Sequence, residues 1–476
     1  MTETSSSIGS RIARYGAILS VSGILCKILL LIYTVMARNI LGQERFGRIE
    51  YFIEMGVIFT VLADFGLEQT VTREIARRRN ELQRMFYPLV TYRFAASLLG
   101  GAAMVFFLCV TARPGHTWAL ILCSLIYFFF VFHVMLIRAV ARSFELLAYE
   151  GLANLLDKIV HIGLAMLCLF YWPRLPLLAL CYAAGAVASL AIFWIVVWKQ
   201  YGMERRSYTV KDWIDWQKLA VPIGLSAACI LLLHREDTAM VNWICGDDET
   251  GLYRFPYRFL EGLFLFPQVL AVSAYPIFSK LYHESRPFSE SAAALMRGLL
   301  IVSLPIAVGG TFIAEDLIQT LCSGIGPRGG VVFKILVWSL PFIYANFLLG
   351  TILNAADRQR LNFRASAWGL ASNALLNLPA IYWWGAVGAS MMTVVSQGLY
   401  GAIMAYYARD FQLWTDGRRY TAIAASCLIM AAVLQWAQWP WYAAIPLGAA
   451  VYFVSLFVLR GVSQKDMQNL RRVVMK

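Results

Sequence analysis

The sequence has few charged residues, and this scarcity limits what the protein can be. Of the 476 residues, 14% are charged and 60% are hydrophobic, whereas a typical globular domain has roughly 25% charged residues. The polar stretches between the hydrophobic runs are too short to fold as separate soluble domains. An ordinary soluble protein is therefore excluded, and we expect the function to lie within the membrane.

Motifs for enzymatic chemistry are also missing. There is no P-loop or other glycine-rich phosphate-binding motif, so the chain is not expected to hydrolyse ATP. The nine cysteines lack metal-binding spacing and most lie in apolar runs, which predicts neither a metal site nor a cofactor. Whether Cys245 and Cys322 are free thiols is left open. The expected outside loops are short and hold few acidic or basic groups, so the sequence does not favour an enzyme.

Long apolar runs predict an all-α polytopic membrane protein. A helix needs about 20 apolar residues to cross a bilayer, and these runs are too long and uniformly apolar for the alternating strands of a barrel. Fourteen transmembrane helices are expected, over residues 15–37, 49–69, 87–111, 117–138, 150–171, 175–198, 217–243, 252–278, 293–314, 329–354, 363–384, 386–408, 419–437 and 441–460.

The distribution of lysine and arginine predicts how these helices are oriented. Basic residues accumulate in the cytoplasmic loops of membrane proteins. With the N-terminus inside, 28 of the 41 basic residues fall in inside segments, 6 fall in outside segments and 7 lie within helices. Both termini are therefore predicted to be cytoplasmic, with the protein in the cell inner membrane. The net charge of +13 follows from this bias and requires no nucleic-acid partner.

Two outside turns indicate an internal repeat. The first outside turn contains Gly42 and Gly47 and the fourth contains Gly246 and Gly251, so both glycines recur at an offset of 204. Glycines in a tight reversal are expected to adopt a positive φ. Because both turns lie on the same side of the membrane, the two halves are predicted to form a parallel repeat about the membrane normal.

The repeat predicts two six-helix lobes followed by two further helices with no assigned role. The predicted parts are the cytoplasmic N-terminal segment, the first lobe, the inter-lobe loop, the second lobe, the last two helices and the cytoplasmic tail. They cover residues 1–14, 15–198, 199–216, 217–408, 419–460 and 461–476.

Several stretches resemble a known transporter family. ARNILGQERFGRIEYF and LADFGLEQTVTREIAR lie within residues 37–77, LNAADRQRLNF occupies 353–363 and YWWGAVGAS occupies 382–390. Together with residues 231–261 they resemble polysaccharide flippases of the Wzx type, over roughly residues 15–410. That family belongs to the MOP superfamily, with the MATE exporters and the lipid II flippase MurJ.

The resemblance implies two bundles around a central cavity and an alternating-access mechanism. It also implies outward movement of an undecaprenyl-pyrophosphate-linked oligosaccharide for surface polysaccharide biosynthesis. The implied partners are membrane lipid and the polymerase and glycosyltransferases of the same pathway. A MATE-like multidrug exporter, a lipid II flippase and, less favoured, a membrane polysaccharide polymerase are the alternatives.

Basic residues deep in the membrane are the candidate substrate-binding groups, because a charge there normally faces a cavity or a partner. They are Lys27, Arg235, Arg254 and Arg258. The helical spacing places Arg254 and Arg258 on one face with Tyr257 and Glu261. Guanidinium groups pair with phosphate bidentately, and a cation exporter would need an acidic cavity instead. Structural ion pairs, Arg258 with Glu261 and Arg235 with Asp237, are the open alternative.

Acidic residues and a histidine in the membrane are candidates for ion coupling, because such groups can carry a proton. They are Glu54, Asp157, His161 and Asp237. Two structural alternatives stay open, a pair between Glu54 and Lys27 and a pair between Asp157 and Lys158.

Other polar residues in the membrane are expected to be structural. Arg93 and Lys334 lie near helix ends and are expected to extend their charges to the surface. Interhelical hydrogen bonds are expected for the amides and hydroxyl on the eleventh and twelfth helices, namely Asn373, Asn377, Thr393 and Gln397.

Overall fold

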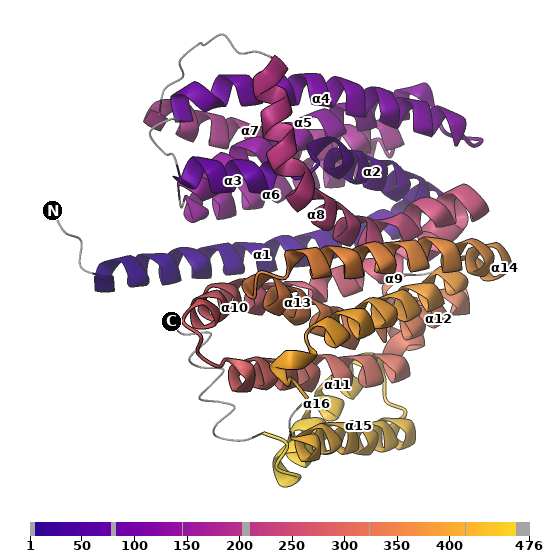
Figure 1. Ribbon diagram of the computed structural model, residues 1–476. Coiled ribbons are helices and arrows are strands. Elements are labelled where there is room, and N and C mark those ends of the chain that lie inside the picture. Colours follow the sequence, from indigo (N-terminus) through magenta and orange to yellow (C-terminus); the bar gives the residue numbers. More distant parts are fainter. Residues whose placement is uncertain are drawn as a thin grey trace. The chain divides into compact units, whose positions relative to one another are not determined.

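The computed structural model describes residues 5–77, 82–144, 146–201, 210–322, 324–414 and 416–462, and within them the fold is all-α (Figure 1). The helices are α1 (Ser5–Leu41), α2 (Gln43–Asp64), α3 (Leu67–Arg77), α4 (Leu82–Val110), α5 (Trp118–Ser143), α6 (Leu147–Tyr171), α7 (Leu175–Tyr201), α8 (Val210–Cys245), α9 (Asp247–Leu263), α10 (Leu265–His283), α11 (Ser289–Leu321), α12 (Gly326–Leu336), α13 (Ser339–Ala355), α14 (Gln359–Tyr407), α15 (Gly417–Ala437) and α16 (Trp441–Val458). Parts of three expected polar segments, residues 1–4, 202–209 and 463–476, lie outside the described residues.

The expected polytopic membrane architecture is confirmed. Among the described residues, eleven helices are long and apolar enough to cross a membrane. Two further expected spans, 49–69 and 217–243, are helical in α2, α3 and α8 but are not among these eleven. The 49-residue α14 contains the expected eleventh and twelfth helices together.

α14 doubles back on itself at Gly385. This residue has φ 57° and ψ −132°, values that a residue with a Cβ rarely adopts. The position of Gly388 abuts the backbone carbonyl oxygen of Ala380, eight residues earlier, and the Tyr400 hydroxyl donates to Asn362 Oδ1 at 3.4 Å. Such contacts require two antiparallel helices, so α14 crosses the membrane twice.

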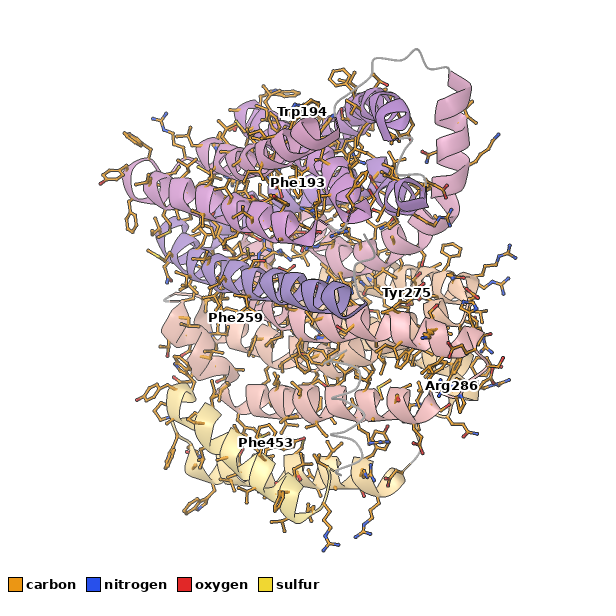
Figure 2. All side chains as sticks on the ribbon, turned by 90° about the vertical axis from the view of Figure 1, so that its left-hand side faces the viewer. Phe193, Trp194, Phe259, Tyr275, Arg286 and Phe453 are labelled. Atoms are coloured by element: carbon orange, nitrogen blue, oxygen red, sulfur yellow. The ribbon has the colours of Figure 1, made fainter. Side chains whose placement is uncertain are left out.

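The chain forms two compact units, Met1–Gly251 and Leu252–Lys476. In the first unit α5, α6 and α7 pack on one another, α1 packs on α6, and α2 and α3 pack on α5. On α7 the neighbours Phe193 and Trp194 are 0% and 37% exposed, so one side of this helix faces the core and another faces outward (Figure 2). The predicted lobe division at 199–216 rests on the repeat and stays a prediction.

α8 belongs to the first unit because it packs on α2 and α3. α2 ends at Asp64, and the positive φ angles of Phe65 (42°) and Gly66 (86°) separate it from α3. At this break Gly66 abuts the backbone of Gly224 on α8, an approach that a side chain on either residue would prevent.

In the second unit α11 packs against α12 and α13, and α10 packs on α13. The last two helices, α15 and α16, pack on each other and on α11, with Ile423, Met430 and Tyr452 at the centre of their apolar contact. The two C-terminal helices thus extend the second unit.

A break between α9 and α10 at Phe264 follows from Pro267. Proline has no N–H, so it cannot donate to the carbonyl four residues earlier in a helix, which here is that of Leu263. The Tyr344 hydroxyl of α13 donates to this carbonyl oxygen at 2.9 Å. The break is therefore satisfied by a side chain from a neighbouring helix.

Candidate functional site

α2 and α8 run antiparallel and carry a charged pair between their ends. Arg235 Nη1 of α8 lies 2.6 and 2.7 Å from the two carboxylate oxygens of Glu54 on α2. Arg235 is flanked by two close backbone approaches, Gly66 on Gly224 in one direction and Gly47 on Asp247 in the other. The sequence left open a pair with Asp237 for Arg235, and the pairing with Glu54 was not predicted.

Burial makes the Glu54–Arg235 pair asymmetric. The Glu54 side chain is 1% exposed, whereas that of Arg235 is 25% exposed. A buried carboxylate needs its counter-ion, because removing one partner of a buried pair leaves an uncompensated charge. Arg235 is thus the accessible member of the pair, and Glu54 is the buried member.

A second group of predicted residues lies on α6. Lys158 Nζ and Asp157 Oδ2 are 3.1 Å apart, which is the structural alternative that the sequence left open. His161, one turn further along, is fully buried and contacts the rings of Tyr33 and Tyr182, with centroid distances of 5.2 and 3.7 Å. The sequence offered no signal for the two tyrosines, because only helix packing places them around the imidazole.

Close packing of α6 on α7 holds this group in place. A Cβ at Gly185 of α7 would clash with Asp157 Oδ1 and would lie 2.8 Å from the Cβ of His161. Lys27 of α1 is half-buried, and α1 packs on α6. Its neighbour Cys26 donates its thiol to the Asn154 carbonyl at 3.6 Å. Lys27 therefore lies on the helix that packs against α6.

The expectation that Arg93 extends its charge to the surface is wrong. Its side chain is 0% exposed and its Nη1 lies 2.6 Å from Asp64 Oδ1. Arg93 Nε also donates to the Phe132 carbonyl at 2.7 Å, and the guanidinium lies 4.1 Å from the Phe132 ring centroid. The break after α2 places the Asp64 carboxylate where it neutralises Arg93, so this pair is structural. Lys334 is exposed, as expected.

In the second unit the predicted α9 face is present. Arg258 Nη1 donates to Glu261 Oε2 at 2.8 Å, and Arg254 Nη1 forms an ion pair with Glu261 Oε1 at 3.5 Å. The Arg254 guanidinium also lies 5.4 Å from the ring centroid of Tyr257. One carboxylate thus serves two guanidinium groups, and these four side chains carry a formal charge of +1.

Polar side chains of α14 take part in contacts between helices, as expected. Asn346 Nδ2 of α13 donates to the carbonyl and side-chain oxygens of Gln397 at 3.1 and 3.0 Å. The hydroxyls of Tyr253 and Thr393 are 3.1 Å apart. Asn373 and Asn377 are fully buried. This part of the second unit is therefore stabilised by hydrogen bonds rather than by charge.

The turns that suggested the repeat contain functional candidates that sequence reasoning missed. Asp247 accepts from Arg48 Nε at 2.7 Å and from Asn242 Nδ2 at 2.8 Å, and it lies 3.1 Å from His116 Nε2. Gln43 donates to Asp248 at 2.7 Å. The signal available in the sequence was the acidic run after Gly246, because the corresponding turn 204 residues earlier carries basic residues.

The conformations of the repeated glycines differ from the expectation. Gly42 and Gly246 have φ angles of 79° and 96°, as tight reversals require. Gly47 and Gly251 instead lie inside α2 and α9, and the lack of a Cβ serves close contact with another backbone. The expected positive φ is therefore right for the first glycine of each turn and wrong for the second.

The predicted residues fall into two sets. Lys27, Glu54, Asp157, His161, Arg235 and Asp237 lie in the first unit, and Arg254 and Arg258 lie in the second. Within the first unit the structure brings Arg235 to Glu54, and Asp237 on α8 is buried. Among the described residues, no group of histidine, cysteine, aspartate and glutamate side chains has the arrangement of a metal site.

Comparison with family models gives two matches. A model described as polysaccharide biosynthesis protein matches residues 12–282. A second model, described as MatE, matches residues 222–383. The first match covers more than half of the chain and includes α2, α6 and α8, which carry the charged groups of the first unit.

Individual proteins agree with these matches. An uncharacterized membrane protein of Methanocaldococcus jannaschii is 20% identical over 377 residues, covering 75% of this chain and 88% of that protein. The probable flippase AglR of Haloferax volcanii is 23% identical over 239 residues, which cover 48% of each chain.

Solved structures show the same fold. A structure of the lipid II flippase MurJ in an inward closed conformation has a TM-score of 0.73 at 16% identity, covering 92% of this chain and 98% of that one. An inward-facing multidrug resistance MATE family transporter of the MOP superfamily has a TM-score of 0.62 at 12% identity, covering 84% and 100%. The expected MOP-superfamily fold is confirmed.

Proposed function

The chain belongs to the polysaccharide biosynthesis protein family, and we propose that it is a flippase for undecaprenyl-pyrophosphate-linked oligosaccharide repeat units. It moves them outward across the inner membrane by alternating access, as a transporter rather than an enzyme. The observation that carries this proposal is the family match together with basic side chains inside a membrane bundle, which suit an anionic headgroup. The relative named as a probable flippase supports it.

Lys27, Arg235, Arg254 and Arg258 are the proposed headgroup-binding residues. Arginine is suited to this role because its planar guanidinium donates two parallel hydrogen bonds to a phosphate. Arg254 and Arg258 lie on one face of α9 with Glu261, so a phosphate that binds there meets two guanidinium groups. The apolar polyprenyl chain stays in the lipid, since its transfer into a polar cavity is unfavourable.

Glu54 is the proposed coupling group of the first unit, with Asp157, His161 and Asp237 as further candidates. When a pyrophosphate binds Arg235, Glu54 loses a contact that stabilises its buried charge. Protonation then becomes favourable, because a neutral carboxyl is stable without a cation. Substrate binding and proton uptake are in this way linked through one ion pair.

The remaining parts of the proposal concern placement and partners. The two lobes 15–198 and 217–408 move against each other, with both termini cytoplasmic. The flippase delivers its cargo to a polymerase outside and receives it from glycosyltransferases inside. This direction follows from the chemistry, because sugar transfer to the carrier lipid precedes flipping and polymerisation follows it.

The test is deletion of the gene in the native host and extraction of undecaprenyl-linked intermediates. A complete repeat unit that accumulates on the inner leaflet, with loss of surface polymer, is the expected result. Accumulation of lipid II instead identifies a lipid II flippase. Restoration by the unaltered chain on a plasmid is the control for effects on neighbouring genes.

A multidrug exporter is the second candidate, favoured by the MatE match over residues 222–383. Drug cations require acidic groups in the cavity, whereas the exposed member of the Glu54–Arg235 pair is the arginine. Unchanged lipid-linked intermediates together with new sensitivity to cationic compounds in the deletion strain would establish the exporter.

A further inference from the structure

The two glycine turns dock on each other with the symmetry of the repeat. A Cβ at Gly47 of α2 would clash with the backbone carbonyl oxygen of Asp247, and a Cβ at Gly251 of α9 would clash with that of Gln43. The repeat offset of 204 relates Gly47 to Gly251 and Gln43 to Asp247. Exchanging each residue for its counterpart therefore converts the contact between Gly47 and Asp247 into the contact between Gly251 and Gln43. The two contacts are therefore reciprocal, as in a two-fold interface.

Polar side chains around this backbone contact also join the two turns. Arg48 Nε lies 2.7 Å from Asp247 Oδ2, and its Nη2 lies 2.6 Å from Glu44. The second Asp247 oxygen accepts from Asn242 at 2.8 Å and lies 3.1 Å from His116 Nε2, on the segment between α4 and α5. Asp247 thus joins the first turn, the second turn and the α4–α5 connection.

We propose that these turns form a latch, made of Gln43, Gly47, Asp247 and Gly251, that holds the outer ends of the two repeats together. Asp247 holds the two turns of the latch in position. The latch must open in each transport cycle. The inference rests on the proposed function for its role in transport. A latch of this kind suits a gate, because two backbone approaches and one ion pair join the turns.

The first experiment measures opening without any substrate. In a variant that retains Cys245 alone of the nine cysteines, a membrane-impermeant maleimide is applied to intact cells. Gly47→Ala, Gly251→Ala and Asp247→Asn should each raise the rate of Cys245 labelling at least several-fold, because they separate the turns. Gly163→Ala is the matched control, since a Cβ there meets nothing within 4 Å. Equal rates in all variants would overturn the latch.

The second experiment holds the latch shut. Gln43→Cys with Asp248→Cys in a cysteine-free chain is cross-linked with a short bifunctional thiol reagent, since the native side chains are 2.7 Å apart. Transport should stop on cross-linking and return when a cleavable cross-link is reduced. Full transport by the cross-linked protein contradicts the latch and leaves the flippase proposal intact. A labelling response without lipid-linked intermediates in the deletion strain contradicts the flippase and leaves the latch intact.

Discussion

Arg235 places one nitrogen between the two carboxylate oxygens of Glu54, at 2.6 and 2.7 Å, and so joins α8 to α2. The two residues are 181 positions apart in the chain and lie in different predicted lobes. The partners differ in access, with the side chain of Arg235 25% exposed and that of Glu54 1% exposed.

Replacement of either partner of this pair should abolish transport. Glu54→Gln and Arg235→Gln each break this ion pair, and breaking a buried pair costs about 3–5 kcal/mol. The double variant has two amides that can hydrogen-bond, so its thermal stability in detergent should return close to that of the unaltered chain. Its transport should stay lost, measured as accumulated lipid-linked repeat units. Recovery of transport by the double variant would assign the pair a structural role alone.

Arg258→Ala should stop transport while insertion into the membrane is retained. Removal of this guanidinium takes away the 2.8 Å contact with Glu261 and one of the two positive charges on this face of α9. Polymer at the cell surface and the amount of protein in the membrane are measured together. Arg286→Ala is the control, because that side chain is 69% exposed at the end of the second unit's α10–α11 connection (Figure 2). Normal polymer output from Arg258→Ala would contradict the headgroup role.

Arg93→Ala should destabilise the first unit without a specific effect on substrate. The Asp64 carboxylate, 4% exposed, would lose its counter-ion, a loss of about 3–5 kcal/mol for a buried pair. Thermal unfolding in detergent measures the effect. Arg73→Ala is the matched control, since that side chain is 44% exposed and its partner is the neighbouring Glu74. Equal melting temperatures for the two variants would show that the Arg93 pair adds no stability.

Tyr344→Phe should weaken the second unit at the break between α9 and α10. The substitution removes only the hydroxyl that donates to the Leu263 carbonyl, and an unsatisfied buried acceptor costs about 1–3 kcal/mol. Thermal unfolding checks this value, with Tyr382→Phe as the control because that residue is 74% exposed. If both variants unfold at the same temperature, another group satisfies the carbonyl.

The membrane class and the helices could be predicted from the sequence alone. These features depend on local composition and spacing, since an apolar run of about 20 residues has few alternatives to a transmembrane helix. The shared face of Arg254 and Arg258 on α9 also follows from helical spacing alone. The reversal within α14 is also marked in the sequence by a glycine, Gly385, at the boundary of two apolar runs.

The pairing of the charged residues, in contrast, became known from the folded chain. Glu54 with Arg235, Asp64 with Arg93 and Asp247 with Arg48 join residues from different helices or turns. Sequence spacing cannot predict such pairs, because they depend on how antiparallel helices pack and where a helix breaks. The same reason explains Gly47, which serves a contact with a backbone 200 residues away rather than a reversal of its own turn.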